Sequence, residues 1–156
     1  MTDLITPDQF RAALQAEYLH VQKTIEDFDG RALTIKAWSV TFGLVAIAGA
    51  FASHACTVFL VASLSAGLFW YLETIWKVFQ LAYYQRSEDI EMHFRGEWVL
   101  LHSFQIGASW MDAWNAVDRP TSLSIALWPH VALPHGFVFV LGISLFALTL
   151  IDVIAP

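Results

Sequence analysis

The sequence predicts an all-α membrane protein, and its composition together with two uncharged stretches supports this fold class. Hydrophobic residues make up 57% of the chain and charged residues 14%, whereas about 25% of the residues in an average soluble chain are charged. Residues 37–72 contain no formally charged side chain, and residues 136–151 are apolar throughout. A soluble domain of 156 residues could not bury so much apolar surface, because small domains have a high ratio of surface to volume. Lipid or further copies of the chain must cover it.

We expect a single helical membrane domain over residues 1–156, made of four consecutive parts. These are a cytoplasmic amphipathic helix (1–32), a transmembrane hairpin with a long second helix that projects inward (33–75), cytoplasmic and interfacial helices (76–133), and a C-terminal third span (134–154).

The first part is predicted to be an amphipathic helix. Thr6 and Gln9 are spaced as a capping box, and Pro7 suits the first helical position. Apolar residues then recur every three or four positions as far as Gly30, which is typical of one helix face. We interpret this stripe as packing against the rest of the protein, with partner binding or membrane-surface binding as alternatives. The candidate partner-binding residues are Phe10, Leu14, Val21, Ile25 and Phe28.

Residues 37–72 predict a helical hairpin, because one span needs only about 20 residues. The polar break at residues 53–56 divides the stretch into spans over about 33–52 and 56–75. Both spans carry small residues, which allow helices to approach closely in lipid. They are Gly43, Ala46, Gly49, Ala50 and Ala52 in the first span and Ser63, Ala66 and Gly67 in the second.

The second span shows no stop signal, so we expect one helix from about residue 56 to 95. Glu73 and Lys77 lie four positions apart on it and can pair on one helix face. We interpret them as a structural pair, with a charged ring at the mouth of an oligomeric pore as the alternative.

The distribution of basic residues predicts the orientation. Arg31 and Lys36 precede the first span, Lys77 and Arg86 follow the second, and the turn between the spans has no Lys or Arg. The positive-inside rule therefore predicts that the N-terminus lies in the cytoplasm.

The last sixty residues predict one interfacial helix and one span. A polar stripe formed by His102, Gln105, Ser109 and Asp112 indicates an amphipathic helix over 97–118, with a fourth span as the alternative. A connecting segment follows, and the third span is expected over 134–154. His130 and His135 at its start are interpreted as interfacial anchors, and a metal or haem pair is the alternative.

Motifs of known chemistry are largely lacking, so we expect no enzyme and no cofactor. There is no hydrolase, zinc-protease or phosphate-binding motif, and one cysteine cannot build a cysteine-based metal site. Arg86 with His93, and Arg95 with His102, match the loose Arg–His spacing of HEPN-type ribonucleases, a pattern that surface polar residues also produce. A net charge of −6 argues against nucleic-acid binding.

Several segments resemble small uncharacterised bacterial multi-span membrane proteins. These segments are residues 35–41 (IKAWSVT), 69–70 (FW), 76–80 (WKVFQ), 83–86 (YYQR) and 133–135 (LPH). That resemblance implies a topology and no particular activity. The expected architecture is also loosely similar to SLATT-type two-span effector modules of bacterial conflict systems, which implies membrane permeabilisation by an oligomer. This chain departs from those modules by adding residues 97–156.

Two functions follow as expectations. The first is a homo-oligomeric pore or membrane-perturbing effector, with antiphage defence as one role. The alternative is a membrane-anchored scaffold or sensor that binds a cytoplasmic protein partner without conducting ions. In both cases the lipid bilayer is the principal partner.

Overall fold

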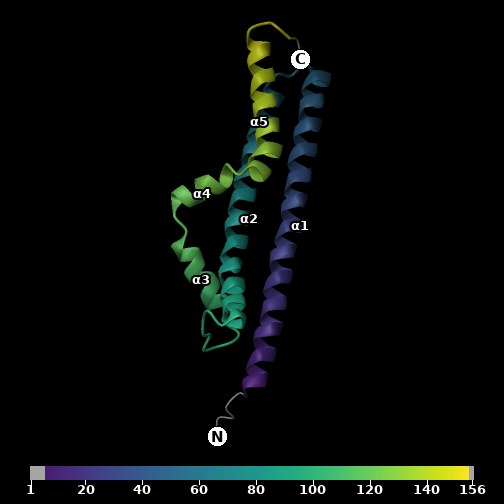
Figure 1. Ribbon diagram of the computed structural model, residues 1–156. Coiled ribbons are helices and arrows are strands. Elements are labelled where there is room, and N and C mark those ends of the chain that lie inside the picture. The colour runs from purple at the N-terminus through teal and green to yellow at the C-terminus, as the bar shows by residue number, and fades with distance from the viewer. Residues whose placement is uncertain (1–5, 155–156) are drawn as a thin grey trace. The chain divides into compact units, whose positions relative to one another are not determined.

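The computed structural model describes residues 6–154, and helices account for most of this part of the chain (Figure 1). In chain order they are α1 (Pro7–Ser53), α2 (Thr57–Arg95), α3 (Ile106–Ala116), α4 (Arg119–Ala126) and α5 (Pro129–Leu150). Three of them, α1, α2 and α5, are long enough and apolar enough to cross a membrane. The predicted all-α class with three long apolar helices is therefore confirmed.

Helix α1 begins where the sequence predicts and ends more than twenty residues later than predicted. Thr6 and Gln9 form the expected capping box, since each backbone N–H is bonded to the other's side-chain oxygen. The predicted end at Gly30 is wrong, because α1 continues without interruption to Ser53. A glycine inside a helix costs only about 1 kcal/mol relative to alanine, and the helix packs against neighbours on both sides of Gly30. The N-terminal amphipathic helix and the first span are thus one helix.

The turn between α1 and α2 lies where the polar break predicts it. His54 adopts a left-handed conformation (φ 53°), and the N–H of Ala55 donates to the carbonyl of Ala50. Helix α2 then runs to Arg95 as one helix, as expected. Gly96 ends it with φ 79°, and the N–H of Glu97 donates back to the carbonyl of Met92. This is a glycine C-cap of the Schellman type.

The predicted helix over 97–118 is only half right. Helix α3 covers Ile106–Ala116, and residues 97–105 form a loop, which we call the anchored loop. The loop is not helical because its backbone bonds to side chains from elsewhere in the chain, as described below. At eleven residues, α3 is also too short to be a fourth span.

The chain after α3 is more helical than predicted. The segment expected to be a simple connection contains α4, and α5 begins at Pro129 rather than near Pro134. Proline suits the first helical position, because its missing N–H would have no partner there. Pro134 lies inside α5, where the missing bond would have gone to the carbonyl of His130 in the helix's first turn.

The chain divides into two compact units. The polar unit comprises residues 6–30 and 77–118, and the apolar unit comprises residues 31–76 and 119–154. Each of the helices α1 and α2 contributes one part to each unit.

The polar unit is an antiparallel pair of helix segments with α3 alongside. Its buried core is formed by Leu14, Val21 and Ile25 from α1 and by Val78, Ala82 and Ile90 from α2. Helix α3 lies along α2 (Figure 1), where the ring of Phe79 stacks on Trp110 and Trp114. The indole of Trp110 also donates to the backbone carbonyl of Phe79.

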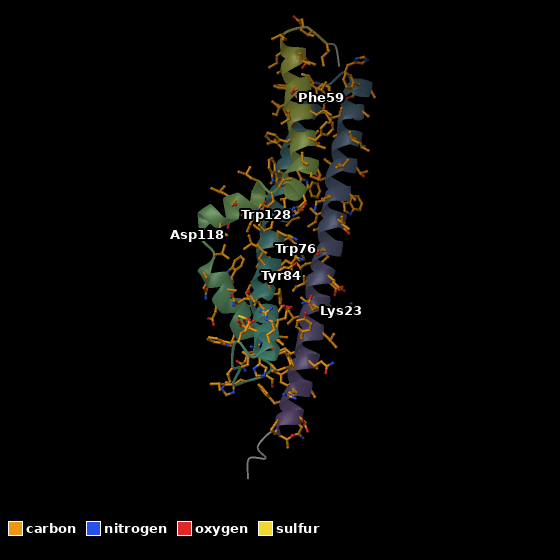
Figure 2. The ribbon with its side chains drawn as sticks, viewed as in Figure 1. Lys23, Phe59, Trp76, Tyr84, Asp118 and Trp128 are labelled. Carbon is orange, nitrogen blue, oxygen red and sulfur yellow. The ribbon has the colours of Figure 1, made fainter. Side chains whose placement is uncertain are left out.

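The apolar unit packs the apolar segments of α1, α2 and α5 against one another. One core cluster contains Ile47, Ala50, Phe59 and Ala62, with Leu141, Leu145 and Phe146 packed against it. Phe59, labelled in Figure 2, is fully buried, and its ring meets Phe51 edge to face. The unit also buries a group of polar side chains, described next.

Candidate functional site

Four polar side chains from three helices form a connected cluster inside the apolar unit, which we call the buried polar cluster. It consists of Lys36 and Ser39 from α1, Glu73 from α2 and His135 from α5. One carboxylate oxygen of Glu73 is paired with the Lys36 ammonium, and the other lies 2.7 Å from His135 Nε2. His135 Nδ1 lies 2.7 Å from Ser39 Oγ. The cluster is therefore a continuous chain of hydrogen bonds from Lys36 to Ser39.

Burial of the cluster is nearly complete. His135 and Glu73 have side-chain exposures of 0% and 1%, and Ser39 is also buried. The Lys36 side chain is 20% exposed and is the one member in contact with the surroundings. Ionisable groups among apolar helices are costly unless they are paired, and they mark functional sites in membrane proteins more often than structural ones.

Close helix packing lies directly beyond the cluster. A Cβ atom on Gly43 of α1 would lie 2.3 Å from a methyl carbon of Val138 on α5. A Cβ atom on Gly142 of α5 would lie 2.3 Å from Ser63 Oγ on α2, and that hydroxyl donates to the carbonyl of Phe139. These glycines allow the three helices to touch, so the interior beyond the cluster is tightly filled.

The surface of the apolar unit carries large apolar side chains on all three helices. They include Leu33, Trp38, Phe42, Val45, Val61, Leu64, Leu68, Leu72, Phe137, Val140 and Ile143. Exposed apolar side chains on this scale indicate contact with lipid or with another protein surface.

Glu73 and Lys77, the residues predicted to pair, have different partners in the structure. Glu73 pairs with Lys36 and His135. Lys77 pairs with Asp29 at 3.1 Å and donates to Gln80 Oε1 at 2.6 Å. Long-range contacts between helices therefore take precedence over the i, i+4 pairing that spacing alone predicts.

The predicted partner-binding stripe is used within the polar unit itself. Leu14, Val21 and Ile25 are buried against α2. Phe10 packs edge to face on His93, and Phe28 packs on Tyr83. The structure therefore uses these five side chains in contacts within the polar unit, and the partner-binding role of the stripe stays a prediction.

A second buried ion pair fixes the anchored loop in the polar unit. Arg86 donates to both carboxylate oxygens of Glu17, at 2.8 and 3.0 Å, and both side chains are buried. The backbone N–H groups of Phe104 and Gln105 donate to the same carboxylate, and Arg86 donates to the carbonyl of His102. The Arg86 guanidinium, a member of one HEPN-like pattern, is therefore occupied by the carboxylate and the loop.

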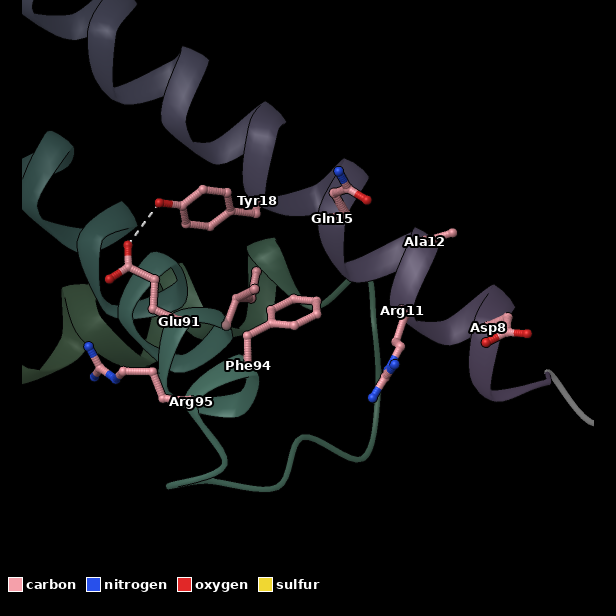
Figure 3. Close-up of a pocket in the computed structure, with 9 residues that line it drawn as sticks. Asp8, Arg11, Ala12, Gln15, Tyr18, Glu91, Phe94 and Arg95 are labelled. Atoms are coloured by element: carbon pink, nitrogen blue, oxygen red, sulfur yellow. Dashed lines mark hydrogen bonds between the residues drawn. The ribbon is translucent and has the colours of Figure 1, made fainter.

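An open groove of about 710 Å³ lies in the polar unit between α1 and the end of α2 (Figure 3). Ile90 and Phe94 are among its apolar lining residues, and Arg11, Gln15 and Tyr18 contribute polar groups. Tyr18 donates a 2.9 Å hydrogen bond to Glu91, drawn in Figure 3. That bond raises the pKa of Tyr18, because ionisation would place a phenolate beside a carboxylate.

Most of the buried polar cluster is not predicted from the sequence. The expectation that His135 is an interfacial anchor is wrong, because the structure buries it completely. No sequence pattern distinguishes Ser39, and Lys36 enters the prediction only as a basic residue before the first span. The available signal was the presence of His135 and Glu73 at the edges of apolar stretches, where each isolated ionisable group needs a partner. Within residues 6–154, no group of three or more His, Cys, Asp or Glu side chains is arranged to hold a metal ion.

No protein-family model, curated protein or solved structure matches this chain.

Proposed function

We propose that this chain is an integral protein of the bacterial inner membrane that assembles into a homo-oligomer and opens or perturbs the bilayer, with antiphage defence as its setting. The apolar segments of α1, α2 and α5 lie in the membrane, and the N-terminus lies in the cytoplasm. The observation that supports self-association is a group of exposed small residues on one side of α1, namely Ala48, Gly49 and Ala52.

This group differs from the small residues that serve folding. Gly43 and Ala50 are buried, and Gly43 contacts α5 closely. Gly49 is exposed, and beyond its chain neighbours and the adjacent backbone of its own helix no heavy atom lies within 4 Å of the Cβ that a substitution would add there. A helix of a second copy could therefore approach α1 closely at this group, since helices associate in lipid through small residues.

The buried polar cluster also bears on where an ion path would lie. Glu73, Ser39 and His135 are bonded to one another inside one chain, and the surface of the apolar unit carries large apolar groups. An aqueous path would then form between copies of the chain, or through lipid that the assembly disturbs. A pore mouth lined by the Glu73 side chains of several copies would require these side chains to be exposed, whereas each is buried inside its own chain.

Induced expression tests the proposal. Cells expressing the wild-type chain should lose membrane potential, measured with a voltage-sensitive dye. The Gly49→Leu variant should fold, lose self-association in cross-linking and preserve the potential. Gly30→Leu is the matched control, because Gly30 also lies on α1 with open space at its Cβ but precedes the apolar segment. An unchanged potential at high wild-type expression would rule out the pore or effector function.

A membrane-anchored scaffold or sensor is the second candidate, favoured by the groove in Figure 3. A cytoplasmic protein would seat an apolar side chain against Phe94 and a polar or acidic group near Arg11. Affinity capture with the wild-type chain, compared with the Phe94→Ala and Lys23→Ala variants, tests this function. A genuine partner should be lost with Phe94→Ala and retained with Lys23→Ala. Recovery of the protein alone, or equal recovery with both variants, would argue against it.

A further inference from the structure

We propose that the buried polar cluster is a proton-binding site that is open on the Lys36 side of the apolar unit and closed on the other. This goes beyond the proposed function, because proton binding is independent of ion flow and of assembly. The ligand is a single proton taken from water, and His135 is the group that accepts it.

The geometry around His135 suits both protonation states of the ring. In the neutral state, Nε2–H donates to Glu73 Oε2, and Nδ1 accepts a hydrogen bond from the Ser39 hydroxyl. After proton uptake, Nδ1–H donates to Ser39 Oγ, whose hydrogen turns to another acceptor, such as a carbonyl one helical turn earlier. One N–H bond forms, one O–H bond of hydronium breaks, and no other heavy-atom contact of the ring has to change.

The charges facing His135 make a balanced site. Helix α1 contributes the Lys36 ammonium and the Ser39 hydroxyl, and α2 contributes the Glu73 carboxylate. Helix α5 contributes one further ionisable side chain, His130, which is exposed at the start of the helix. When the His135 imidazole is neutral, the positive charge of Lys36 and the negative charge of Glu73 balance. A proton bound to His135 then adds one positive charge directly beside the Glu73 carboxylate.

Access to the site has a direction. Lys36 is the one partly exposed member of the cluster, and Glu73 connects it to His135, so a proton can enter from the Lys36 side. Toward the C-terminal end of α1, the close contacts of Gly43 with Val138 and of Gly142 with Ser63 fill the interior. A proton at His135 therefore returns the way it came, as expected for a sensing site and not for a transport path.

Purely structural pairing is a weaker account of the cluster. A buried ion pair contributes little net stability compared with apolar side chains of similar size, and helices that only anchor a protein need no such group. A histidine with a hydrogen-bonding partner on each ring nitrogen can instead keep both contacts with and without the additional proton.

The first test is a nitrogen-15 NMR titration of the histidine rings of the full chain in lipid nanodiscs. One ring signal that is absent in His135→Gln should change from the neutral to the doubly protonated form as the pH is lowered. It should stay in His130→Gln, the matched control on the same helix. A His135 signal that keeps one form throughout would overturn the proposal.

The second test addresses direction, with wild-type protein in vesicles selected for one orientation. Infrared difference spectra with isotope-labelled histidine should respond to acid added on the side of the α1 N-terminus and not to acid on the opposite side. An equal response from both sides, or a response from the opposite side alone, would overturn one-sided access. Neither readout depends on ion flux, so failure of the pore function would leave both results interpretable.

Discussion

Glu73 Oε2 on α2 and His135 Nε2 on α5 lie 2.7 Å apart, although 62 positions separate the two residues in the sequence. Both side chains are buried, and the contact ties the third apolar helix to the hairpin that precedes it. Since Glu73 also holds Lys36, this one carboxylate joins the three long apolar helices within the apolar unit.

Removing the charge of Glu17 should destabilise the polar unit and release the anchored loop. Glu17→Gln leaves Arg86 buried without its anion, and breaking one partner of a buried pair costs about 3 kcal/mol or more. We expect a lower unfolding midpoint in detergent and faster protease cleavage within residues 97–105. Glu26→Gln, at an exposed position of the same helix, is the control and should change neither measurement. Equal protease resistance of Glu17→Gln and wild type would contradict the role given to this carboxylate.

Adding a methyl group to Gly142 should weaken the packing of α5. Its Cβ would lie 2.3 Å from Ser63 Oγ and 2.8 Å from the backbone oxygen of Phe59, which cannot easily move. Overpacking of this kind costs about 1–3 kcal/mol, so Gly142→Ala should lower the thermal midpoint in detergent. Gly49→Ala, where the added Cβ meets open space, should leave the midpoint unchanged or raise it slightly. If both variants behaved alike, the close approach of α2 and α5 would be wrong.

The hydrogen bond from Tyr18 to Glu91 should appear in the alkaline pH dependence of stability. The pKa of Tyr18 is raised above the ordinary tyrosine value, chiefly by this bond. The contribution of this hydrogen bond to folding stability is therefore fully present below about pH 10. It is lost as the pH rises through the pKa that Tyr18 has in the folded state. Carbon-13 NMR of labelled tyrosine should show Tyr18 ionising at lower pH in Glu91→Gln than in wild type. The same midpoint in both proteins would exclude Glu91 as the cause.

Labelling of cysteines from the two sides of the membrane tests the proposed topology. Cys56 lies in the turn between α1 and α2 and is partly exposed. A membrane-impermeant maleimide should modify it in intact spheroplasts. Gln85→Cys in a Cys56→Ser background should be modified only after permeabilisation, since Gln85 is exposed in the polar unit. Modification of both positions in intact cells would exclude the hairpin as two complete spans.

Much of the fold could be predicted from local sequence. The capping box at Thr6, the turn at residues 53–56 and the glycine end of α2 all depend on neighbouring residues, and the structure places each where the sequence does. The break at Gly30 was predicted wrongly, because a single glycine weakens a helix without ending it when packing supports both flanks. The predicted start of the third span at residue 134 is too late, because proline also begins helices and α5 starts at Pro129.

The sequence by itself determined that the chain is helical and that three of its helices are apolar enough to span a membrane, because hydrophobic period and length are local properties. Only the tertiary structure decided which polar side chains meet. Glu73 binds Lys36 and His135 instead of its neighbour Lys77, and Glu17 holds a loop 87 positions away. The physical reason is that a buried charge takes the partner that folding brings to it, and spacing along one helix carries no information about the others.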